Sequence, residues 1–344
     1  MAVRGEPLGR RAEPFSDRNG RAGVRALAAL ALALVAALST GAATAQTKMW
    51  RVATLSPVGA NVLVQDQLVR GLREFGYVEG QNLVLDRRSS EGHPERLGPL
   101  AAQIVRERPD VVVAVSPPAV EALRKATTTI PIVALDLETD PVRNGLAASV
   151  ARPGGQVTGI YLDVPEIQGK WLQLLREVVP RLSSLAVLYD PGVHELQLKA
   201  TEAAAKSLGI QVRAHVVRAP DEFAPAFKAI IAQRPGALII LAAPLHYREA
   251  PRIVEFALKR KLPSIALFRE FPAAGGLMSY GVVLPDLFFR AARYVDRILK
   301  GTRAGDLPIE LLERFELVVN GKTAAALGIK LPQSLLLRAN EVVH

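Results

Sequence analysis

Hydrophobic and polar positions along the chain follow two alternating periods. Short β-branched runs such as residues 110–115 (DVVVAV) are almost continuously apolar, which is typical of strands buried on both faces of a parallel sheet. Stretches such as residues 94–108 repeat apolar side chains every three or four positions, which predicts amphipathic helices. The two patterns follow one another from residue 50 to residue 299, so the sequence predicts an α/β fold.

The expected elements fall into two sets of similar length. The first set has strands at residues 50–55, 82–87, 110–115 and 130–136 and helices at 62–75, 94–108 and 119–125. The second has strands at 185–189, 211–217, 237–242 and 263–268 and helices at 166–179, 195–208, 222–233 and 252–260. Residues 140–159 lie between the sets, contain the turn Pro153-Gly154-Gly155, and are interpreted as the passage between two lobes. We therefore expect two Rossmann-like, doubly wound parallel-sheet lobes, joined by a hinge that can close on a ligand.

A last amphipathic helix, residues 286–299, follows a second set that is already complete. We expect this helix to return to the first lobe. The predicted N-terminal lobe then consists of residues 46–160 and 285–302. The predicted C-terminal lobe and tail consist of residues 161–284 and 303–344.

The first 45 residues have the pattern of a signal peptide. Arg21 and Arg25 precede thirteen apolar residues, 26–38, fewer than the ~20 that span a bilayer as a helix. Ala43-Thr44-Ala45 fits the small-x-small rule, which predicts cleavage after Ala45 and a mature chain that starts at Gln46. An uncleaved N-terminal anchor is the alternative. We expect export to the periplasm.

Composition and motifs argue against several function classes. The net charge of +10 is not gathered into a basic run with interleaved aromatics, so no nucleic-acid partner is expected. The absence of cysteine excludes disulfides, Cys-ligated metals and a lipidated cysteine. No HExxH or GxSxG motif occurs, and Gly321-Lys322-Thr323 follows Glu316 where a phosphate-binding loop needs glycine, so we interpret it as a helix start. We expect no catalytic residue, metal or cofactor.

The candidate ligand residues follow predicted strands, because open α/β sheets bind ligands at the carboxyl ends of their strands. They are Ser56, Ser116, Pro117 and Asp136 in the first lobe and Tyr161, Tyr189, Asp190, His246 and Phe268 in the second. Ser116 is the expected N-cap of the helix at 119–125, and hydroxyls and helix-start N–H groups suit a carboxylate. An ordinary capped turn is the alternative. Asp136 suits an ammonium group or a helix cap, and the aromatic residues suit stacking or packing at the cleft lip.

Motifs in the last third of the chain carry a resemblance. They are residues 276–281 (GLMSYG), 306–310 (DLPIE), 315–320 (FELVVN), 322–329 (KTAAALGI) and 331–342 (LPQSLLLRANEV), together with 140–142 and 151–159 (ARPGGQVTG). In this order they resemble the periplasmic substrate-binding proteins of ABC transporters, in the tryptophan/tyrosine-type branch. The resemblance covers residues 49–344.

The resemblance implies a type I periplasmic-binding-protein fold with three crossovers between lobes. It implies a monomer without enzymatic activity that captures a small, amino-acid-like solute, with an aromatic one as the leading candidate. The solute would pass to a membrane permease that a separate ATPase subunit powers. A periplasmic sensor that feeds a receptor or kinase is the alternative, because it would have the same lobes. A lac-repressor-type regulator is set aside, because an export signal occupies the place of its DNA-binding segment.

Overall fold

A computed structural model describes residue 1 and residues 48–57, 62–137, 140–162, 164–312 and 314–344 of the chain. Within it, Met49–His344 forms one compact unit. The predicted signal peptide and its cleavage site after Ala45 lie outside the described residues. Within the described ranges, every helix is too short or too polar to cross a membrane.

The first sheet has six parallel strands in the order β11-β5-β4-β3-β1-β2. Its strands are β1 (Trp50–Ser56), β2 (Leu83–Ser89), β3 (Val111–Val115), β4 (Ile132–Leu137), β5 (Val157–Tyr161) and β11 (Glu310–Leu311). Its helices are α2 (Val62–Glu74), η1 (Pro94–Arg96), α3 (Leu97–Arg106), α4 (Pro117–Ala126), α11 (Leu284–Leu299) and η3 (Ala304–Asp306). We call these elements the first lobe.

Both faces of the first sheet are covered. In β3, Val111 and Val113 belong to the hydrophobic cluster that includes α2 and α11, whereas Val112 and Ala114 belong to the cluster of α3 and α4. All four side chains are fully buried. The uninterrupted apolar run of β3 is therefore that of a strand between two helical layers.

The second sheet has seven strands in the order β13-β12-β10-β9-β8-β6-β7. Its strands are β6 (Ser184–Tyr189), β7 (Gln211–Val216), β8 (Ala237–Ile240), β9 (Ser264–Ala266), β10 (Met278–Val282), β12 (Phe315–Asn320) and β13 (Glu341–Val343). Its helices are α5 (Val164–Val178), α6 (Pro191–Ser207), η2 (Pro220–Glu222), α7 (Phe223–Gln233), α8 (Pro244–Arg248), α9 (Ala250–Lys259), α10 (Glu270–Ala273), α12 (Gly321–Leu327) and α13 (Gln333–Arg338). These elements are the second lobe.

The two lobes repeat one strand order. The order β2-β1-β3-β4-β5 in the first sheet corresponds to β7-β6-β8-β9-β10 in the second. Each sheet reverses its direction of winding between its first and third strands, β1 and β3 in one and β6 and β8 in the other. Crevices at such switch points are the usual ligand sites of open α/β sheets. The predicted architecture of two doubly wound α/β lobes is confirmed.

The second sheet is mixed rather than wholly parallel, because β12 runs antiparallel to β10. The chain passes three times between the sheets: from β5 to α5, from β10 to α11, and from β11 to β12. On the last passage it enters the second sheet from the end at which β10 finishes. This direction of entry makes β12 antiparallel.

Two segments lie in the first lobe where the sequence analysis placed them elsewhere. Residues 140–159 were expected to form the passage between lobes and Tyr161 to belong to the second lobe. Residues 157–161 instead form β5, so Tyr161 belongs to the first sheet. β11 pairs with β5, with Glu310 opposite Ile160, so the first lobe continues beyond residue 302. Neither strand has a clear apolar run. Thr158 and Gly159 interrupt the run in β5, and β11 has only two residues.

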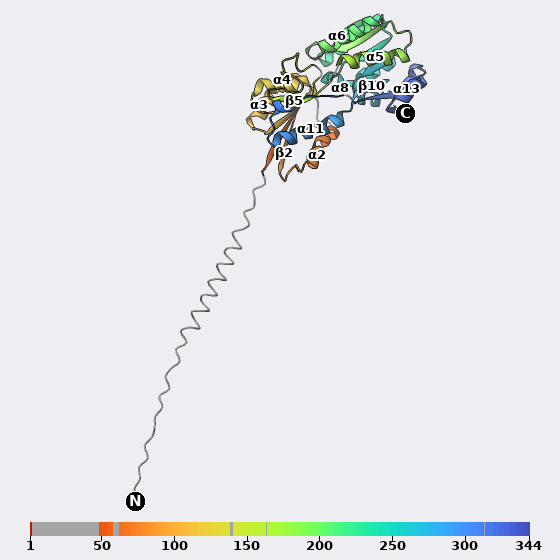
Figure 1. Cartoon of the computed structure of the whole chain (residues 1–344). Helices are drawn as coiled ribbons and strands as arrows, with labels where there is room; N and C mark the ends of the chain where they lie inside the picture. The colour runs from red at the N-terminus through yellow and green to blue at the C-terminus, as the bar shows by residue number, and fades with distance from the viewer. Residues whose placement is uncertain (2–47, 58–61, 138–139, 163, 313) are drawn as a thin grey trace. The chain divides into compact units, whose positions relative to one another are not determined.

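The helix α11 packs against α2 on the first lobe, as Figure 1 shows. Tyr77 follows α2 and donates its hydroxyl to Asp296 of α11 over 3.1 Å. Burial, with the hydrogen bond to the Asp296 carboxylate, raises the pKa of Tyr77 to about 12. Tyr294 of α11 donates to the carbonyl of Pro308 at 3.0 Å, which connects the helix to the segment that leads into β11.

Candidate functional site

The first-lobe candidates gather at one edge of the sheet, where parallel strands end. Ser56 is the last residue of β1, and Ser116 follows β3, whose Ala114 lies opposite Leu55 of β1. The Ser116 N–H donates to Leu135 O at 2.9 Å, which places Asp136 of β4 at the same level. Tyr161 ends β5, opposite Leu137 of β4. The side chain of Asp136 lies outside the described part of the structure.

Ser116 has an unusual backbone and an unusual hydroxyl environment. Its φ of 68° and ψ of 159° are rare for a residue with a side chain, and such conformations cost roughly 1–3 kcal/mol. The residue is 8% exposed, and its Oγ is buried with no hydrogen-bond partner among the described residues. Strained residues of this kind gather at ligand sites, where the rest of the fold holds them in place.

The expected capping role of Ser116 is wrong in one respect. The residue does occupy the N-cap position of α4, but its side chain makes no capping hydrogen bond. The next two residues, Pro117 and Pro118, have no N–H, and the N–H of Val120 already donates to Ser116 O at 3.3 Å. The start of α4 therefore offers an anion fewer donors than a normal helix N-terminus. The Ser116 hydroxyl, which has no partner among the described residues, becomes the more important group for a ligand.

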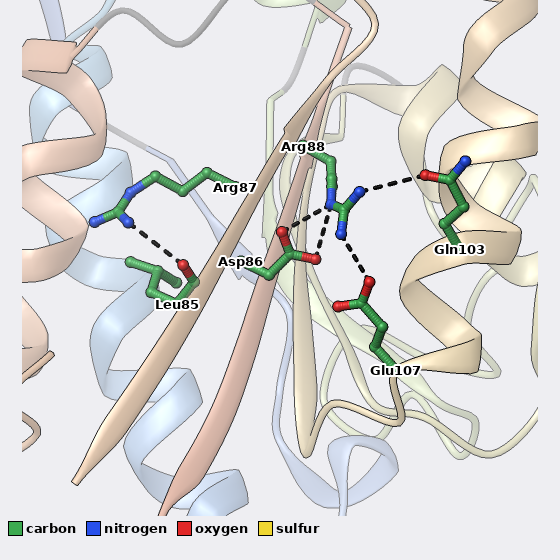
Figure 2. A network of polar contacts seen from close by, with 6 residues as sticks. All are labelled: Leu85, Asp86, Arg87, Arg88, Gln103 and Glu107. Atoms are coloured by element: carbon green, nitrogen blue, oxygen red, sulfur yellow. Dashed lines mark hydrogen bonds and ion pairs between the residues drawn. The ribbon is translucent and has the colours of Figure 1, made fainter. Parts of the chain in front are cut away.

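The two arginines at the end of β2 already have carboxylate partners. Arg88 donates to Asp86 at 2.7 Å and to Glu107 at 2.8 Å, and its contact with Gln103 measures 3.3 Å (Figure 2). Arg87 forms an ion pair with Glu79 at 2.8 Å. These contacts hold both guanidinium groups within the first lobe. A ligand carboxylate at this edge would therefore rely on hydroxyl groups.

The second-lobe candidates lie at the corresponding edge. Tyr189 ends β6 and Asp190 follows it, and both are half-buried. Phe268 follows β9, is half-buried, and meets Tyr247 of α8 edge-to-face with ring centroids 5.7 Å apart.

His246, on α8, is only 1% exposed, and its Nδ1 lies 2.8 Å from Leu241 O. Its ring also lies against Phe223 of the core helix α7. The structure thus places this histidine within the second lobe, behind the edge rather than on it.

A direct contact connects the two edges. Arg248 at the end of α8 donates from Nη1 to the carbonyl of Glu91, in the loop that follows β2, at 3.1 Å. A Cβ on Gly92 would lie 2.4 Å from the same Nη1, so the glycine leaves room for the guanidinium. The contact joins the first and second lobes at the ends of strands in both sheets.

The sequence analysis missed several polar residues at these edges. Thr54 of β1 is 1% exposed, and its Oγ1 has no partner among the described residues. In the second lobe, Glu270 Oε2 and Glu316 Oε1 are also buried without a hydrogen-bond partner among the described residues. Burial raises the pKa of Glu270 and that of Glu316, and the charge of Arg269 opposes both shifts. Neither glutamate ends a predicted strand, so the rule that selected the other candidates passed over them.

A surface hollow lies beside α5. It has a volume of about 360 Å³ and is lined by Glu166, Ile167, Gly169, Lys170, Gln173, Tyr280 and Phe315. The rings of Tyr280 and Phe315 are 5.7 Å apart. Tyr280 belongs to the GLMSYG motif, which carried the resemblance but was not assigned to the site.

The segment Gly321-Lys322-Thr323 begins α12, as predicted. The side chain of Asn320 caps this helix by accepting the N–H of Thr323 at 2.8 Å. In the described ranges, no group of three or more His, Asp or Glu side chains is arranged to hold a metal ion.

Comparisons with known proteins agree with this geometry. The family model described as ABC transporter substrate binding protein matches residues 54–343. The chain is similar to a tyrosine-binding protein of Clostridioides difficile, with 26% identity over 76% of this chain and 75% of the relative. A conserved domain protein from Vibrio cholerae is 29% identical, with a TM-score of 0.80, over 86% of this chain and all of that one.

The same fold occurs in the ABC domain from Streptococcus pneumonia in complex with L-Trp. That structure has a TM-score of 0.79 and 24% identity, over 86% of this chain and all of the other. The family match covers most of the chain, including both sheets. The chain therefore belongs to the ABC transporter substrate-binding protein family, which works outside the cytoplasm.

Proposed function

We propose that this protein binds an amino acid, with an aromatic one as the first candidate, between the carboxyl ends of its two sheets. It acts as a monomer without catalysis, and it delivers the solute to a membrane permease that a separate ATPase powers. The observation that carries the proposal is Ser116, a strained residue whose buried hydroxyl has no partner among the described residues, at the switch point of the first sheet. The tyrosine- and L-Trp-binding relatives support an aromatic amino acid.

The chemistry at the two edges assigns a different part of the ligand to each lobe. In the first lobe, Ser116 and Ser56 offer hydroxyls to a carboxylate. In the second, Tyr189 and Phe268 offer half-buried rings to an aromatic side chain. Asp190 lies beside Tyr189. Pockets of this kind obtain much of their affinity from apolar walls and fix the ligand with few polar groups.

A thermal-shift screen of the purified protein against amino acids and small organic acids tests the proposal. A ligand at ~100 times its dissociation constant should add about 2.7 kcal/mol to the free energy of unfolding. We expect L-tyrosine or L-tryptophan to raise the melting temperature. Light scattering on the same sample checks the monomer, and a flat response across the panel would contradict the proposal.

The Ser116→Ala variant tests the role of the hydroxyl. We expect its affinity for the ligand to fall roughly tenfold or more, because a hydrogen bond to a charged group contributes about 1.5–3 kcal/mol. The ligand-free variant should be at least as stable as the wild type, since the lost hydroxyl is buried and has no partner among the described residues. Ser334→Ala, at an exposed position of α13, is the matched control. Equal affinity in both variants would remove Ser116 from the site.

We further propose that the protein reaches the periplasm by a signal peptide that is cleaved after Ala45. The support is the apolar run at residues 26–38 followed by Ala43-Thr44-Ala45. When the full chain is expressed in a Gram-negative host, the intact mass of the periplasmic product should correspond to residues 46–344. A product that retains residues 1–45 in the membrane fraction would favour an uncleaved anchor.

A further inference from the structure

A small cavity opens at the ligand-facing edge of the second lobe. It has a volume of about 30 Å³. A cavity needs roughly 10–15 Å³ by this measure to hold one water molecule, and a protonated amine is of similar size to water, so the cavity has room for either. The cavity lies where β8 and β9 end, and its walls include His246, Tyr247, Phe268, Glu270 and Phe271.

Glu270 is the one carboxylate in the lining of this cavity. Its Oε2 is buried and has no hydrogen-bond partner among the described residues. The neighbouring cation, Arg269, does not compensate for it directly: its guanidinium donates to Glu316 at 3.2 Å and also contacts Glu341. Burial raises the pKa of Glu270 accordingly. A buried carboxylate is costly unless a cation or donor reaches it.

The walls of the cavity suit a cation. Tyr247 and Phe268 meet edge-to-face at its border, and aromatic rings attract cations to their faces. The cavity is also close to the first lobe, because Arg248, next to Tyr247 on α8, donates to the carbonyl of Glu91. A ligand held at the end of the first sheet could therefore extend a small group toward it.

We propose that Glu270 and the aromatic walls of this cavity form a subsite for the protonated amine of the ligand. The subsite rests on the proposed function, and it assigns the two charges of an amino acid to opposite lobes. The carboxylate lies with the hydroxyls of the first lobe, and the ammonium group lies with Glu270 of the second. Binding of one zwitterion then holds both lobes together, because neither lobe satisfies both charges.

Isothermal titration calorimetry with the purified full-chain product tests the subsite through paired probes. L-tyrosine and 3-(4-hydroxyphenyl)propionate differ only by the amine. We expect the wild type to bind L-tyrosine at least tenfold more tightly. The isosteric Glu270→Gln variant should lose roughly ten- to hundredfold in affinity for L-tyrosine, while its affinity for the propionate stays the same or rises.

Glu255→Gln is the matched control, because Glu255 lies exposed on α9 of the same lobe and pairs with Lys259. It should bind both probes as the wild type does. If Glu270→Gln discriminates between the probes as well as the wild type, the cavity holds only water and the subsite is wrong. A wild type that prefers amine-free solutes also overturns the subsite but leaves solute binding intact. A wild type that binds neither amino acids nor amine-free solutes overturns both proposals.

Discussion

Replacement of Gly159 by alanine is expected to lower the free energy of unfolding by roughly 3 kcal/mol or more. Gly159 lies in the middle of β5, opposite Ala134 of β4, with a φ of +140° that side chains rarely allow. A Cβ at this position would lie 1.9 Å from Ala134 O and 2.7 Å from Ala134 N. Both are backbone atoms, so the clash can be relieved only if the two strands separate.

Urea unfolding followed by circular dichroism measures this effect. Gly169→Ala is the control, because Gly169 lies inside α5 and an added Cβ would meet nothing within 4 Å. That change should stabilise the protein by up to ~1 kcal/mol, since glycine is a poor helix former. A Gly159→Ala protein within about 1 kcal/mol of the wild type would show that β4 and β5 do not approach this closely.

Truncation of Trp171 to alanine should cost about 3–5 kcal/mol, the range for large aromatic side chains in a core. Trp171 is 1% exposed and is the largest of the fully buried side chains. It lies on α5, and its indole N–H donates to the carbonyl of Tyr280 in β10 at 2.6 Å. The variant therefore loses apolar packing between α5 and the second sheet and also one buried hydrogen bond.

The variant Trp171→Phe separates the two contributions. It keeps an aromatic ring but no donor, so a loss of about 1–3 kcal/mol is expected from the missing hydrogen bond and the smaller ring. Leu196→Ala serves as a surface control, since Leu196 is 52% exposed on α6 and should change stability by less than about 0.5 kcal/mol. If Trp171→Ala were as stable as this control, α5 would not depend on the tryptophan to pack on the sheet.

Two glycines show why the sequence motifs of this chain contain the residues they do. Gly159 ends the stretch ARPGGQVTG, and its role is the close approach of two strands. Gly281 ends GLMSYG, and a Cβ there would lie 2.1 Å from Leu267 O. These glycines serve the backbone packing of the sheets. The motif glycines therefore indicate the fold, and the residues that bind the ligand have to be identified from other positions.

The strand-end rule predicted the position of most site candidates. Ser56, Ser116 and Asp136 lie together at the first sheet because parallel neighbours end at one edge. Tyr189, Asp190 and Phe268 take corresponding places at the second. His246 lies on the short helix α8 with its ring against Phe223, and it lines the cavity that contains Glu270. The rule assigned Tyr161 to the wrong sheet, because β5 carries no clear apolar run.

The sequence by itself determined the two-lobed α/β architecture, because the apolar periods of buried strands and amphipathic helices are local properties of the chain. It also indicated that α11 returns to the first lobe, since the second set of elements was complete without it. Only the tertiary structure decided that β5 and β11 join the first sheet. It also showed that the Ser116 hydroxyl is buried without a partner among the described residues. Only the tertiary structure placed Glu270 at a cavity. Each of these depends on contacts between segments distant in sequence, where packing and hydrogen bonding outweigh local preference.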